Sequence, residues 1–136
     1  MCLEIVARIA PDAKNRISAK RLSELTGLVV TPCKTEGVAG LHFSVSGGCS
    51  CEFLADDADP EGETWLLSAD RLPALSRAIS SLTDECGKFD FIARWLDGEP
   101  PARSERIAGS ALAKLVSANA IGNNVRYEVG IRRPPA

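Results

Sequence analysis

The chain has 136 residues, of which 45% are hydrophobic and 25% charged, and its net charge is −2. This balance is typical of a soluble globular domain and excludes a disordered chain. No apolar run is long enough to cross a membrane, and the small net charge gives no general attraction to nucleic acid or anionic lipid. We therefore expect one domain over residues 1–131, a tail over 132–136, and neither a nucleic-acid nor a membrane partner.

The cysteines bear on the compartment. Their number, five, is odd, which argues against a fully paired disulfide framework. Residues 1–8 lack the basic and apolar regions of a secretory signal. We therefore expect a cytoplasmic protein whose cysteines are thiols.

The N-terminal residues predict a strand and a helix. Residues 2–10 alternate apolar and polar side chains, which is typical of a strand. Ser18 is a good N-cap and Gly27 a good stop, so a helix of about two turns is expected between them. Leu22 and Leu25 are its predicted core residues.

The next segment predicts three strands. Residues 28–30 form a brief apolar strand that ends at Pro32. The two following segments, 38–46 and 49–55, are joined across a Gly-Gly turn. We expect them to form a β-hairpin over residues 38–55.

The C-terminal half alternates helical and strand patterns. One helix has a regular apolar stripe, and the strand after it is apolar on both faces, as in the centre of a sheet. The expected elements are a helix from Ser68 or Asp70 to Gly87, a strand at 88–97, a helix from Ser104 to Gly122 and a strand at 125–131. Together these elements predict an α+β fold, with a single mixed sheet of about five strands and about three helices packed on it.

The sequence Cys49-Ser50-Cys51 is the first candidate site, and its chemistry depends on the hairpin register. With a loop of two residues, 47–48, His42 shares a face with Cys49 and Cys51, which makes three possible metal ligands. With a loop of three residues, 46–48, both cysteines face apolar side chains and His42 lies on the opposite face. We favour the second register because it separates apolar from polar side chains better.

A second candidate is the acidic loop. Asp57, Asp59 and Glu61, followed by Gly62, resemble the opening of an EF-hand calcium loop. The twelfth position of that pattern is Ser68 instead of the bidentate Glu. A solvated loop is therefore the favoured interpretation, with the three carboxylates as the candidate calcium ligands. Trp65 follows this loop and would be a partner anchor if it were exposed, although core packing is the default.

No nucleophile with a neighbouring base, phosphate-binding loop or dinucleotide fingerprint is visible in the sequence. We therefore expect a small non-catalytic binding or interaction domain without a cofactor, whose partner is an unknown protein or small molecule. The alternative is a thiol-dependent metal-binding or redox protein that uses Cys49 and Cys51. The hairpin and the strand at 125–131 also offer possible sheet edges, and a homodimer is predicted from them.

Overall fold

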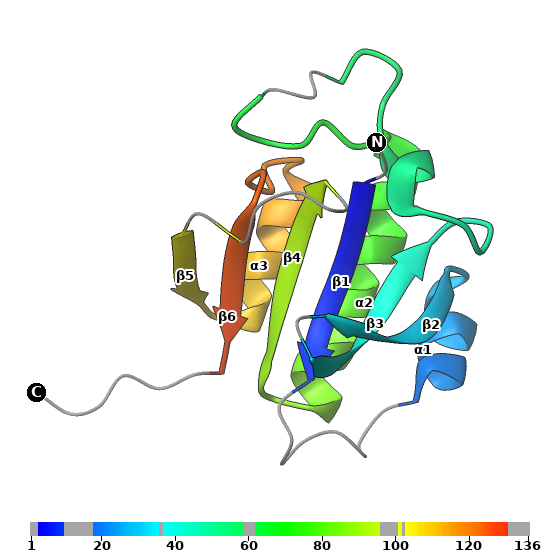
Figure 1. Cartoon of the computed structure of the whole chain (residues 1–136), viewed down its shortest axis with the longest axis vertical. Helices are drawn as coiled ribbons and strands as arrows, with labels where there is room; N and C mark the ends of the chain where they lie inside the picture. Colours follow the sequence, from blue (N-terminus) through cyan, green and yellow to red (C-terminus); the bar gives the residue numbers. More distant parts are fainter. Residues whose placement is uncertain are drawn as a thin grey trace, which may run out of the picture.

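A computed structural model describes residues 3–9, 18–35, 37–58, 62–95, 101 and 103–130. It contains one mixed sheet of six strands, and three α-helices cover one face of that sheet (Figure 1). This confirms the predicted α+β class, with one strand more than expected. Within the described ranges, no helix is long and apolar enough to span a bilayer.

The elements alternate along the chain. The strands are β1 (Leu3–Ile9), β2 (Val29–Thr35), β3 (Val38–Ser44), β4 (Phe89–Trp95), β5 (Arg103–Ile107) and β6 (Val125–Val129). The helices are α1 (Ala19–Thr26), α2 (Leu72–Glu85) and α3 (Gly109–Ser117), and two 3₁₀ turns, η1 (Ser50–Phe53) and η2 (Ala69–Arg71), precede α2.

The sheet has the order β2-β3-β1-β4-β6-β5. The first four strands, with α1 and α2, form a β-α-β-β-α-β unit of the split βαβ type, in which all neighbours are antiparallel. The C-terminal unit β5-α3-β6 extends this sheet, since β6 pairs with β4 and β5 pairs in parallel with β6. Helix α3 is the crossover that a parallel pair requires.

Helix α1 begins where the sequence predicts. The Ser18 hydroxyl accepts a hydrogen bond from a backbone N–H of the first turn, at 3.1 Å. Leu22 is buried, but the prediction that Leu25 faces the core is wrong, because its side chain is 43% exposed. Thr26, four residues after Leu22 and therefore on the same face, is buried instead.

The prediction that Pro32 ends the second strand is also wrong. Strand β2 continues through Pro32 to Thr35 and pairs with β3 over its whole length. Because β2 is an edge strand, the missing N–H of Pro32 removes no bond from the interior of the sheet.

The predicted hairpin over residues 38–55 does not form. Strand β3 pairs with β2 over its whole length on one side and with β1 at residues 40–42 on the other, so residues 49–55 do not pair with it as a hairpin strand. Those residues form the 3₁₀ turn η1 and the segment after it. Neither of the two predicted hairpin registers therefore exists. The hairpin that β3 does form is with β2, the strand before it.

The prediction that Ser104 caps the last helix is wrong as well. Ser104 lies in β5, and α3 begins at Gly109 and ends at Ser117. Parallel pairing with β6 outweighs the local capping signal at Ser104. The chain turns at Asn119, with a positive φ of 57°, before it reaches Gly122.

These corrections change the edges available for self-association. Both strands on which the predicted homodimer rests, β3 and β6, are interior strands of the sheet. The edge strands are β2, which carries Pro32 and Lys34, and β5. The homodimer stays a prediction.

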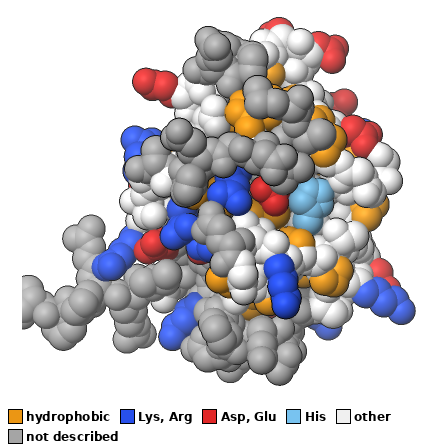
Figure 2. All heavy atoms as spheres, viewed as in Figure 1, with side chains coloured by type: hydrophobic (Ala, Val, Ile, Leu, Met, Phe, Trp, Pro, Cys, Tyr) orange, Lys and Arg blue, Asp and Glu red, His pale blue; other side chains and the backbone are white. Residues whose placement is uncertain are grey.

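The two faces of the sheet differ in chemistry. The helix-covered face holds the core, which includes Ile5 and Phe91. The opposite face carries Arg8, which forms an ion pair with Asp90 at 2.6 Å, and Arg94, which lies 3.4 Å from Glu4. Figure 2 shows basic and acidic side chains interspersed on this face, beside the histidine. The ion pairs align the strands with one another but leave the face mixed in charge.

Candidate functional site

Cys49 and Cys51 lie at the 3₁₀ turn η1, and both are half-buried thiols. The Cys51 sulfur accepts a hydrogen bond from the backbone N–H of Leu3, at 3.0 Å. Cys51 therefore supplies an acceptor at the start of β1, where β1 and β3 are no longer paired with each other.

Ser50, between the two cysteines, is fully buried, and its side chain makes hydrogen bonds to both β1 and β3. Its hydroxyl accepts from the N–H of Ile5 at 3.0 Å and donates to the carbonyl of Phe43 at 2.5 Å. Its side chain thus bridges two strands that have separated. Sequence reasoning missed this residue, because a serine between two cysteines carries no pattern of its own.

His42 lies on the face without helices, and its Nε2 is 3.4 Å from the Ser50 hydroxyl. Burial lowers the pKa of His42, and the negative charge of Glu4 opposes that shift. The Ser50 proton is directed at the Phe43 carbonyl, so this arrangement is not a nucleophile with its base.

The predicted calcium ligands stay a prediction, because two of the three lie outside the described residues. Among the described residues, no group of three or more His, Cys, Asp or Glu side chains is close enough to hold an ion. Asp57 is exposed in a turn. Asp59 and Glu61 lie outside the described residues.

Trp65 belongs to the core, with 1% of its surface exposed. Its indole N–H donates to the Ala93 carbonyl at 2.9 Å, and its ring packs edge-on against Trp95 at 5.0 Å. The condition for a surface anchor is therefore not met. Its backbone N–H donates to the Ile121 carbonyl at 2.8 Å, which ties the loop before it to the turn before β6.

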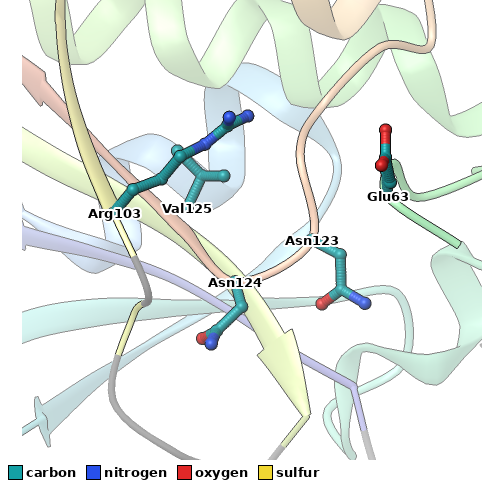
Figure 3. A pocket seen from close by; sticks show the side chains of 5 residues that line it. All are labelled: Glu63, Arg103, Asn123, Asn124 and Val125. Atoms are coloured by element: carbon teal, nitrogen blue, oxygen red, sulfur yellow. The ribbon is translucent and has the colours of Figure 1, made fainter. Parts of the chain in front are cut away.

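A pocket of about 220 Å³ lies beside that turn (Figure 3). It is lined by Glu63 from the loop before Trp65, Arg103 at the start of β5, Asn123 and Asn124 from the turn, and Val125 at the start of β6. Four of these five side chains are polar or charged. In Figure 3, Arg103 and Glu63 lie on opposite sides of the view, and Asn123 lies between them.

Backbone hydrogen bonds hold the polar wall of the pocket in place. The N–H of Asn123 donates to the Glu63 carbonyl at 2.8 Å, and the N–H of Asn124 donates to the Ala93 carbonyl at 3.1 Å. Asn124 has a positive φ of 61°, a conformation that Asn tolerates better than most residues. The wall is thus built before any ligand arrives.

Gly122 and Tyr127 complete this support. The N–H of Gly122 donates to the Tyr127 hydroxyl at 2.7 Å. A Cβ at Gly122 would lie 2.7 Å from a methyl carbon of Val125, so the close approach requires glycine. Burial raises the pKa of Tyr127, while the Gly122 hydrogen bond lowers it. The phenol therefore stays neutral at physiological pH.

The charged groups of the pocket are accessible. The Arg103 side chain is 65% exposed and lies 3.4 Å from the Glu105 carboxylate, which is 44% exposed. An ion pair this exposed contributes little to stability, so Arg103 can exchange partners. Glu63 is also exposed, whereas Val125 forms a buried apolar floor.

Sequence reasoning missed this pocket entirely. It used Gly122 as a helix stop and Ser104 as a cap, and it assigned no role to Asn123 or Asn124. The Gly-Asn-Asn sequence is a turn signal, but nothing in it indicates contact with Glu63. Comparison with known proteins adds no guide: no family model matches the chain, and neither a curated protein nor a solved structure matches it significantly.

Proposed function

We propose that the chain is a non-catalytic binding domain for a small polar molecule that occupies the pocket at Glu63, Arg103, Asn123 and Asn124. The observation that carries the proposal is a preformed wall with a cation, an anion and two amides around one apolar residue. Convergent polar groups at fixed positions orient a bound ligand, and in this pocket they outnumber the single apolar residue.

The lining favours binding over catalysis. Of the five lining residues that the structure describes, Glu63 is the one whose side chain could act as a base or nucleophile, and the other four are an arginine, two amides and a valine. Amides and a guanidinium orient a ligand by hydrogen bonds without changing its covalent structure.

The size of the pocket limits the ligand. At about 30 Å³ for each water-sized group, a pocket of about 220 Å³ holds about seven such groups. This is smaller than the pockets that take drug-sized molecules, which begin at about 300 Å³. A small metabolite is therefore the ligand that the pocket itself could enclose, and any larger ligand would extend past the exposed side chains of Glu63 and Arg103 into solvent.

The proposal is tested by nuclear magnetic resonance on the ¹⁵N-labelled chain, titrated with a library of small carboxylates, amines and amino acids. We expect amide shifts concentrated at Gly122, Asn123 and Asn124. Gly37, at the end of the sheet beside β2, serves as the internal control. Absence of any shift at millimolar ligand, or shifts centred on other residues, would show that this pocket is not the site.

The thiol-dependent alternative keeps one observation in its favour. A backbone N–H directed at the Cys51 sulfur stabilises the thiolate more than the thiol. Reactive reduced thiols also fit the cytoplasmic location, which remains part of the proposal.

A further inference from the structure

We infer that the ligand of this pocket is a small zwitterion, whose carboxylate binds Arg103 and whose ammonium group binds Glu63. The inference rests on the proposed function and adds the class of ligand. Its basis is the presence of one cation and one anion among the lining residues, on opposite sides in Figure 3.

Each charged residue selects one end of the ligand. The planar guanidinium of Arg103 presents parallel N–H donors that match a carboxylate. The Glu63 carboxylate only accepts hydrogen bonds, so it matches an ammonium group, which only donates. Asn123 lies between the two charged residues in Figure 3, and its amide oxygen can accept a hydrogen bond from a ligand while its nitrogen donates to the Gly62 carbonyl at 3.3 Å. The amide oxygen of Asn124 is buried.

Ligands with a single charge fit less well. A simple anion that binds Arg103 brings a like charge into the pocket that holds Glu63, and a simple cation at Glu63 meets Arg103 in the same way. Because one cation and one anion line the pocket, a ligand with one charge of each sign can pair with both, provided that its carboxylate displaces Glu105 from Arg103.

Arg103 also has an internal competitor. The Glu105 carboxylate, 3.4 Å from Arg103, stands where a ligand carboxylate would compete for the same guanidinium. Removing the Glu105 charge by Glu105→Gln should therefore tighten the binding of any ligand that uses Arg103. If the ion pair between Arg103 and Glu105 were only structural, Glu105→Gln would not tighten ligand binding.

The experiment measures the affinities of two zwitterions, γ-aminobutyrate and the shorter L-serine, and of two single-charge analogues, butyrate and butylamine. Titration calorimetry gives the affinities, and amide shifts locate the binding. We expect at least one zwitterion to bind about tenfold more tightly than either single-charge analogue, a difference of about 1.4 kcal/mol. Arg103→Gln should weaken the zwitterion and butyrate alike. Glu63→Gln should bring the zwitterion and butyrate to equal affinity.

Arg106→Gln is the matched control, since Arg106 lies on the opposite face of β5, where it pairs with Glu128 at 3.8 Å. It should leave all affinities unchanged. If butyrate or butylamine binds at this pocket as tightly as the zwitterions, the inference is wrong while the proposed function stands. If library members shift Asn123 and Asn124 but neither zwitterion does, the inference fails in the same way. If no compound shifts these amides, both fail.

Discussion

At the scale of single residues, short polar side chains do the work of backbone partners where strands separate. The Ser50 hydroxyl and the Cys51 sulfur receive the N–H groups of Ile5 and Leu3, which β3 no longer reaches. Buried N–H groups left without a partner would cost about 1–3 kcal/mol each. The apolar appearance of Cys51 in the sequence therefore hides a structural hydrogen bond.

Thiol reactivity separates the two functional proposals. Because Cys49 and Cys51 are half-buried at a turn that is hydrogen-bonded to β1, the binding-domain proposal predicts slow reaction with a disulfide reagent in the folded protein. Burial raises the pKa of Cys33, which makes this thiol a useful slow reference. The measurement is timed labelling followed by peptide mass spectrometry.

Denatured protein, in which every thiol reacts quickly, calibrates that labelling. Reaction of Cys51 in the folded state far ahead of Cys33 would support the thiol-dependent alternative instead. Equal, slow rates would leave both cysteines as structural residues.

At the scale of elements, the close approach of β1 and β3 depends on Gly40. A Cβ at this position would lie 2.5 Å from the carbonyl oxygen of Ala7, which is backbone and cannot rotate away. We expect Gly40→Ala to lower the free energy of unfolding by about 1–3 kcal/mol, measured by urea denaturation.

Gly48→Ala is the control for that substitution. A Cβ at Gly48 meets no atom within 4 Å, so the change should stay within about 0.5 kcal/mol of wild type. Equal stability of the two variants would mean that β1 and β3 can move apart at no cost.

The elements predicted correctly are those in which several local signals agree. For α2, the apolar period, the Pro in the first turn and the Gly after its end all indicate the same helix. For β4, apolar side chains on both faces indicate a central strand. Strand β5 fails this test, since its charged sequence has no alternation and its pairing comes wholly from β6. Residues 49–55 are predicted to be a strand but form a 3₁₀ turn, because a turn can bury their apolar side chains as readily as a strand can.

The pocket could not be predicted from sequence patterns for a different reason. Arg103, Glu63 and Asn123 come from three separate segments, and only the pairing of the C-terminal unit with β4 brings them together. Neither the contact nor its polarity can be derived from the spacing of those residues. The candidates Cys49, Cys51 and His42, by contrast, rest on a Cys-x-Cys pattern and on a hairpin register that would place all three on one face.

At the scale of the whole molecule, the shifted pKa values of His42 and Tyr127 make stability depend on pH. The pKa of His42 is lowered from 6.5 by burial, so the folded state resists its protonation. The stability that this group contributes is present above pH 6.5 and is lost as the pH falls through the lowered value. The pKa of Tyr127 is raised from 10.0, so its contribution is present below pH 10.0 and is lost at more alkaline pH.

We therefore expect the free energy of unfolding to decline at both acid and alkaline pH. In urea denaturation over a pH series, His42→Gln should reduce the acid decline and leave the alkaline one. Tyr127→Phe should do the reverse, although it also removes the acceptor of the Gly122 N–H. A His42→Gln profile parallel to wild type would contradict the assignment of the acid decline to His42.

The seam between the N-terminal β-α-β-β-α-β unit and the C-terminal β5-α3-β6 unit runs through the pocket. Glu63 belongs to the N-terminal unit, whereas Arg103, Asn123 and Asn124 belong to the C-terminal unit. The backbone hydrogen bonds from Asn123 to Glu63 and from Asn124 to Ala93 join the two units. Each unit alone thus supplies only part of the pocket lining. A ligand bound in the proposed site would contact both units, so its binding would also stabilise the contact between them.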